Sequence, residues 1–178
     1  MASQFWVSQL QPYPVASGAA YNTSIALTDV SPAPQIIIPG GTFQPGQIYR
    51  VAASGTFSNT LTPTLLLGVY IGGVAGAGFS GGAITTITAA TNWQWHMEIN
   101  FQVRTIGTTG TFMPLNGKLR MPASATSFQT MYCVPSTAPA TVTRDTTAAQ
   151  AITIGAQWGA SAAANTLTCL GVTVEQMN

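Results

Sequence analysis

The stretch "WQWHMEINFQVRT", from Trp93 to Thr105, alternates apolar and polar side chains along its whole length. Successive side chains of a β-strand point to opposite faces of a sheet, so this alternation predicts one strand with an apolar side and a polar side. Such a strand spans about 40 Å, enough to cross a whole β-sandwich. We expect the apolar side to fill a core. The polar side, Gln94 through Arg104, either faces an adjoining subunit or lies in solvent.

Other strand-like runs lie on both sides of this stretch, and no segment shows sustained apolar recurrence at three- and four-residue steps. Runs rich in Thr, Val and Ile with glycine punctuation favour strands. About eight strands with uneven loops predict an all-β fold, a jelly roll or β-sandwich, over residues 46–178. Besides residues 93–105, the expected strands are "QIYRVAAS", "TPTLLLGVYIGG", "AITTITAAT", "FMPLNGKLRM", "SATSFQTMYCV", "AQAITIGAQW" and "TLTCLGVTVEQM". Asn116-Gly117 is typical of a tight hairpin turn.

Residues 1–45 are expected to form an extended N-terminal arm, because prolines interrupt them repeatedly. The arm also carries apolar side chains, which need a docking site on the chain's own domain or on a neighbouring subunit. We predict that this arm reaches a neighbour through Phe5, Trp6, Ile36, Ile37 and Ile38. Trp6 in particular is a candidate anchor for a pocket of a partner.

Charged residues make up only 5% of the chain, against roughly 25% in ordinary soluble domains. Hydrophobic residues make up 46%, so the chain is also unlike a disordered segment. We infer a subunit of an assembly whose surface is partly covered by other subunits. The net charge is +1 and the basic residues are dispersed, so no patch for nucleic acid is visible.

Residues suited to catalysis or metal binding are few. His96 is the single histidine, and Glu98 shares its strand face at about 7 Å spacing. A cross-strand polar pair is the favoured interpretation over a metal site or an oriented catalytic histidine. "GAGFSG" matches the dinucleotide-binding spacing in letters, but the helix and the ribose-binding acid are missing from the pattern, and a closely packed or mobile loop is favoured. We therefore predict no catalytic residues, cofactor or metal.

Three further features have structural interpretations. Cys133 and Cys169 form no disulfide framework, and both are expected to be buried. The sequence does not decide whether a single disulfide joins them. Trp93, Trp95 and Trp158 are expected in the core, although a carbohydrate-stacking platform is the alternative. The N-terminus lacks a secretory pattern, and the longest apolar stretch, Leu65 to Phe79, is shorter than the about 20 residues of a membrane span.

The strand "TPTLLLGVYIGG", the strand and turn "WQWHMEINFQVRTIGTTGTF" and the ending "AITIGAQWGASAAANTLTCLGVTVEQMN" resemble small jelly-roll proteins of tailed bacteriophages. These are the capsid decoration or cement proteins and the related β-sandwich modules of tails. The resemblance implies a jelly roll, commonly homotrimeric, that binds a lattice of major capsid protein on the virion surface. It carries over no catalytic residues. We also predict no membrane association, no small-molecule ligand and synthesis in the host cytoplasm.

A decoration protein would bridge neighbouring capsomers and stabilise the head, with repeated weak contacts strengthened by avidity. Glu98 and Arg104 are expected to pair between copies across a threefold axis. Three alternatives stay open. The chain could be a tail or fibre protein that contacts a host receptor through the loops Gly72–Gly82 and Ala160–Asn165, a jelly-roll coat protein, or a small hydrolase.

Overall fold

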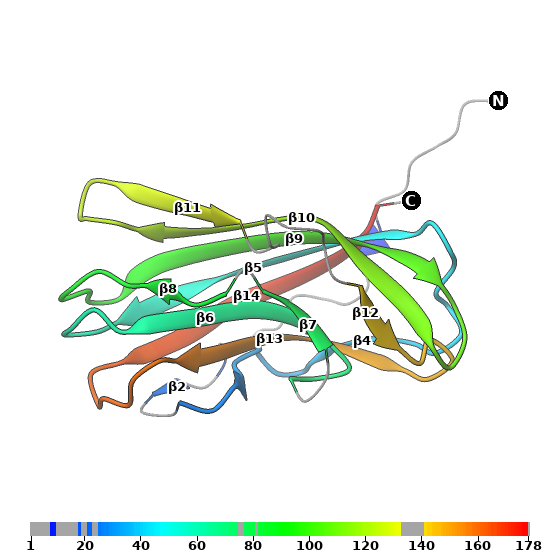
Figure 1. Cartoon of the computed structure of the whole chain (residues 1–178), viewed down its shortest axis with the longest axis horizontal. Helices are drawn as coiled ribbons and strands as arrows, with labels where there is room; N and C mark the ends of the chain where they lie inside the picture. Colours follow the sequence, from blue (N-terminus) through cyan, green and yellow to red (C-terminus); the bar gives the residue numbers. More distant parts are fainter. Residues whose placement is uncertain are drawn as a thin grey trace.

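The computed structural model is a β-sandwich of two antiparallel sheets (Figure 1). It describes residues 8–9, 18, 21–22, 25–74, 77–80, 82–132 and 141–177. Sheet A has the order β1-β14-β5-β9-β10-β11, with β2 on β14 and β12 on β10. Its strands are β1 (Ser8–Gln9), β2 (Tyr21–Asn22), β5 (Ile48–Ser58), β9 (Trp93–Thr105), β10 (Gly110–Pro122), β11 (Phe128–Tyr132), β12 (Val142–Arg144) and β14 (Thr166–Gln176).

Sheet B is smaller and lies below sheet A in Figure 1. Its order is β3-β13-β6-β7, with β4 also on β13 and β8 also on β6. Its strands are β3 (Thr28–Asp29), β4 (Ile36–Ile38), β6 (Thr64–Ile71), β7 (Ala77–Ser80), β8 (Ile84–Thr85) and β13 (Gln150–Trp158). Consecutive long strands such as β5 and β6, or β13 and β14, belong to opposite sheets, so the chain winds between the layers as in a jelly roll. The predicted all-β fold is confirmed.

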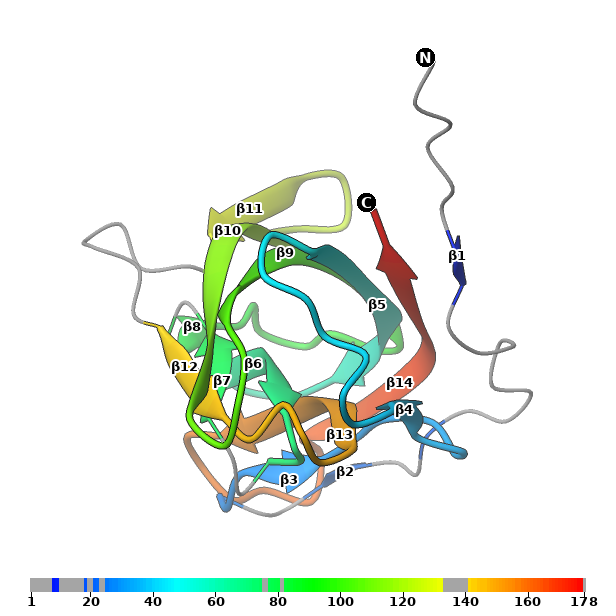
Figure 2. The same ribbon diagram turned by 90° about the vertical axis from the view of Figure 1, so that its right-hand side faces the viewer.

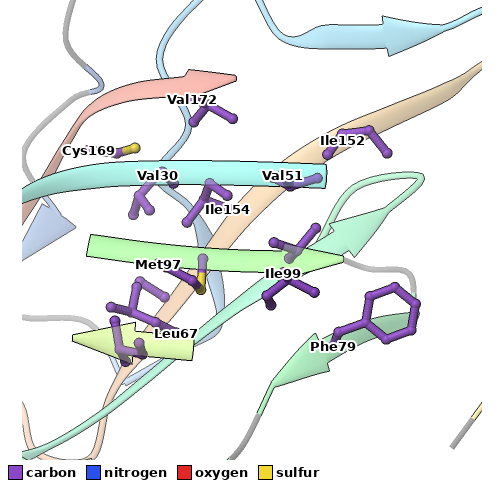
Figure 3. Close-up of a cluster of buried hydrophobic side chains, with 14 of the residues drawn as sticks. Val30, Val51, Leu67, Phe79, Met97, Ile99, Ile152, Ile154, Cys169 and Val172 are labelled. Atoms are coloured by element: carbon purple, nitrogen blue, oxygen red, sulfur yellow. The ribbon is translucent and has the colours of Figure 1, made fainter. Parts of the chain in front are cut away.

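The strand β9 has the predicted bounds, Trp93–Thr105. Its odd-numbered side chains from Trp95 to Val103 are at most 1% exposed, whereas His96 and Arg104 on the other side are exposed. On sheet B, the inward side chains of β13 are buried to the same degree, as its alternation predicts. The two sets meet between the sheets, where Met97 and Ile99 of β9 lie among residues of β5, β6 and β13 (Figure 3). Hydrophobic alternation in both sheets therefore accounts for the core.

The core interpretation of the tryptophans is confirmed for Trp95 and Trp158, which are 1% and 0% exposed. Gly55 makes room for Trp95, because a Cβ at Gly55 would lie 2.8 Å from the indole ring and would overlap the carbonyl oxygen of Thr168. Trp93, at the start of β9, is partly buried and packs against the core. These side chains fill the sandwich and form no exposed stacking platform.

The hairpin turn predicted at Asn116-Gly117 is wrong. Both residues lie inside β10, opposite Asn100 and Ile99 of β9, and a bulge between Pro114 and Asn116 keeps the strand paired. A tight hairpin of that type needs positive φ, and the described glycine with positive φ between β9 and β10 is Gly107. The chain reverses there, in the turn expected at the end of "WQWHMEINFQVRTIGTTGTF". Leu119, which follows in β10 and pairs with Met97 of β9, is 4% exposed.

The predicted arm, residues 1–45, contributes strands to both sheets. From Thr28 onward it is built into sheet B, since β3 and β4 both pair with β13. Ile36 and Ile38 are 5% and 1% exposed within their own chain, so the expectation that they reach a neighbour is corrected for these two residues. The alternation of β4 leaves Ile37 outside, 45% exposed. Phe5 and Trp6 lie outside the described residues.

Candidate functional site

The polar side of β9 forms the middle of the outer face of sheet A. The register places Arg50 of β5 opposite Asn100, and Lys118 and Arg120 of β10 opposite Glu98 and His96. On the far side of β5, Glu175 of β14 is opposite Arg50. Polar residues of four strands therefore come together on this face, and β5 and β14 are distant in sequence from the consecutive strands β9 and β10.

This outer face gathers most of the charge of the molecule. The chain has five basic and four acidic residues, and all lie in the described part of the structure. Six of these nine are on the outer face of sheet A, while Asp29, Arg144 and Asp145 are elsewhere. The six are Arg50, Glu98, Arg104, Lys118, Arg120 and Glu175. A chain so poor in charge thus concentrates it on one surface.

Two carboxylates of this face are bonded to one guanidinium. Arg50 Nη2 donates to Glu98 Oε2 at 3.2 Å, and Arg50 Nη1 lies 3.5 Å from Glu175 Oε2. The three side chains are 30–40% exposed, so each pair stabilises the fold by about 0.2–1 kcal/mol at most. Arg104 Nη1 donates to Gln102 Oε1 at 2.7 Å. Glu98 and Arg104 lie about 20 Å apart along β9, so their pairing between copies stays a prediction.

Lys118 and Arg120 differ from Arg50, because among the described residues neither takes part in an ion pair. Glu98, which is opposite Lys118, is bonded to Arg50 instead. The Arg120 guanidinium lies 5.8 Å from the centre of the Phe128 ring, a cation–π contact. Phe128 is 63% exposed. This side of the face therefore presents two cations without a carboxylate partner in the described chain.

Two adjoining hollows lie beside Lys118 and Arg120, and together we name them the basic groove. The first, about 340 Å³, has the exposed apolar side chains of Phe128 and Leu170 in its lining. The second, about 500 Å³, is lined by Glu98, Asn100, Asn116 and Lys118. His96 and Arg120 line both hollows. Figure 2 shows β11 next to β10 at this edge of sheet A.

His96 is exposed and lies opposite Ser54 of β5, a pairing that the sequence did not indicate. Nucleophilic catalysis needs a hydrogen bond from the nucleophile to the base and a group that orients the base. No hydrogen bond joins Ser54 to His96 among the described contacts, and the carboxylate of Glu98 is bonded to Arg50 rather than to His96. Within the described residues, no group of three or more His, Cys, Asp or Glu side chains could hold a metal ion. What the face can do chemically is bind an anionic, partly apolar surface.

Other predicted features have structural positions away from this face. Cys169 is a buried free thiol, and burial raises its pKa to about 12; Cys133 lies outside the described residues. In "GAGFSG", the segment Ala77–Ser80 is the strand β7 rather than the start of a helix, so the dinucleotide interpretation does not hold. Gly78 there packs against the Tyr70 ring. No described segment forms a helix that is long and apolar enough to cross a membrane.

The two loops considered for receptor contact are not brought together. Gly72, after β6, is bonded to Ala151 at one end of β13, whereas Gly159, at the start of the other loop, is bonded to Thr64 at the opposite end of β6. The eight residues of β6 separate these positions by about 25 Å. The Ala160–Asn165 loop borders instead a hollow of about 360 Å³ with Leu61 and Pro63. Each loop would therefore need its own ligand.

Comparisons with known proteins do not extend this description: no protein-family model, no curated protein and no solved structure matches the chain.

Proposed function

We propose that the protein is a structural subunit of a virion, a capsid decoration protein that stabilises a phage head by bridging capsomers. The observation that carries the proposal is the concentration of charge and of exposed Phe128 and Leu170 on the outer face of sheet A. Interfaces combine aromatic and arginine anchors with a polar rim, and this face offers both. Its partners are the major capsid protein and further copies of the chain, in a homotrimer.

A binding role is also consistent with how the chain distributes its surface. The jelly roll builds its core without help from the charged residues, so these side chains are available for contacts between subunits. Weak contacts of this kind become effective when a symmetric oligomer repeats them on a lattice. The exposed Ile37 of β4 would belong to a second contact, at the edge of sheet B.

The test is the position of the protein in purified particles. Gold-labelled antibodies against the chain should bind the heads of phage particles that carry it, and particles without the protein should release their genome at a lower temperature. Label at the tail tip would favour the receptor-binding alternative, and label absent from the particles would overturn the proposal. Sedimentation of the purified protein would establish whether it forms a trimer.

A further inference from the structure

We propose that the basic groove binds an extended acidic segment of the partner protein, with two carboxylates and one apolar side chain at alternate positions. The inference rests on the proposed function, because it assigns the chemistry of the partner for that same face. It is carried by the two cations without an ion-pair partner in the described chain and by the apolar hollow next to them.

The spacing of the cations fits an extended segment. Lys118 and Arg120 are two residues apart on one side of β10, so their side chains leave the sheet about 7 Å apart. An extended peptide that runs along β10 repeats its side chains on one side with the same spacing. Two acidic residues at alternate positions of such a peptide would each meet one cation.

The next position in the same direction meets the apolar hollow. β10 runs from Lys118 through Arg120 toward Pro122, which pairs with Phe128 of β11. The hollow lined by the exposed side chains of Phe128 and Leu170 begins there, with Arg120 in the same lining. A leucine-sized side chain placed after the two acids would enter it and bury apolar surface. The arrangement therefore predicts the order acid, acid, apolar along the segment.

The rest of the groove suits a polypeptide better than a nucleic acid. Asn100 and Asn116 line its polar end, where Asn100 Nδ2 donates to Asn116 Oδ1 at 2.8 Å. Glu98 lies beside them, and its carboxylate is paired with Arg50. Nucleic-acid binding rests on neutralising several phosphates in a row, and the groove has only Lys118 and Arg120 for that purpose.

The experiment uses the full chain labelled with ¹⁵N and a short capped peptide with two glutamates and a leucine at alternate positions. We expect amide shifts at residues 94–98, 116–120 and 128, weakened by added salt. A peptide with glutamine in place of both glutamates should bind at least about fivefold more weakly, the factor that corresponds to ~1 kcal/mol. The variant Lys118→Gln/Arg120→Gln should lose the shifts, whereas Arg104→Gln, on the same face but outside the groove, should keep them.

Several results would overturn the inference. They are equal binding of the glutamine peptide, shifts confined to other surfaces, or no shifts at millimolar peptide. Tighter binding of a DNA oligonucleotide at the same residues would also overturn it. If Lys118→Gln/Arg120→Gln lowers the sedimentation coefficient while the peptide fails to bind, the occupant is a second copy of the chain. The exposed positions of both side chains keep the variants folded, which an unchanged unfolding midpoint would verify. Antibody labelling of particles is independent of these results, so failure of the groove and failure of the proposed function are distinguishable.

Discussion

The outer faces of the two sheets are built in opposite ways. On sheet B, the Tyr70 ring lies against Gly78 and Gly155 and is 7% exposed, and Thr153 opposite it is fully buried. On sheet A, the corresponding side carries six charged residues and the exposed ring of Phe128. The chain thus covers one outer face with its own side chains and leaves the other open. The difference indicates where a partner would contact the molecule.

The largest expected difference in stability is between two variants that each remove an aromatic ring, one from the outer face of each sheet. Tyr70→Ala should lower the free energy of unfolding by about 3–5 kcal/mol, because it leaves a cavity over the glycines of sheet B. Phe128→Ala should change it by about 0.5 kcal/mol or less, since its ring is 63% exposed. Urea unfolding of both variants measures the two losses in the free energy of unfolding. Equal losses would contradict the claim that sheet B has a packed outer face and sheet A an open one.

Two glycines make a smaller and more local comparison. A Cβ at Gly155 would overlap the Tyr70 ring, whereas a Cβ at Gly171 on sheet A would meet nothing within 4 Å. We expect Gly155→Ala to destabilise the fold by about 1–3 kcal/mol through overpacking. Gly171→Ala is the matched control and should be close to neutral. Thermal unfolding followed by circular dichroism would detect the difference, and a neutral Gly155→Ala would contradict the close packing of sheet B.

The covered face should also respond to alkaline pH. Burial raises the pKa of Tyr70 above its usual value of 10.0, with an opposing contribution from Ser80. A raised folded-state pKa contributes stability that is complete below pH 10 and lost as the pH rises further. Tyr49 and Cys169, with pKa values of about 12, act in the same direction. Tyr70→Phe should therefore flatten the fall of the urea midpoint above pH 10, and an unchanged slope would show that Tyr70 titrates as if exposed.

The smallest effects belong to the ion pairs of the open face. Glu98→Gln and Glu175→Gln should each cost about 0.2–1 kcal/mol at low salt, because the paired side chains are 30–40% exposed. Most of that cost should disappear at 1 M salt, where the screening length is about 3 Å. Losses well above this range, or losses that salt leaves unchanged, would indicate that these carboxylates support the fold rather than a contact surface.

Local alternation was sufficient to predict the strands that build the core. Trp93–Thr105 and the run from Ile152 to Trp158 each show their apolar side without knowledge of any neighbour, and both are confirmed. The errors arose where tertiary contacts overrule local signals. Asn116-Gly117 has the composition of a turn, yet it pairs with β9 inside a strand. In the glycine-rich stretch after β6, Ala77–Ser80 pairs with β6 as the strand β7, and Gly78 lies against the Tyr70 ring.

The candidate site was only partly predictable for the same reason. Glu98 and Arg104 were identified because they lie on the polar side of one long strand. Arg50, Lys118 and Arg120 join them through pairing of β5 and β10 with β9, and no single segment records that register. The alternation of Lys118 and Arg120 within "GKLRM" was the available signal, since it places both on one face. The groove itself was not predictable from this alternation, because its lining also includes Phe128 of β11 and Leu170 of β14.

The central claim is that the outer face of sheet A is covered when the protein is assembled. His96 is the single histidine of the chain, is exposed, and lines both hollows of the basic groove. Diethylpyrocarbonate labelling of the imidazole, read by mass spectrometry, should modify His96 rapidly in the dissociated protein and at least about tenfold more slowly in the assembled particle. Equal rates in the two states would contradict the claim.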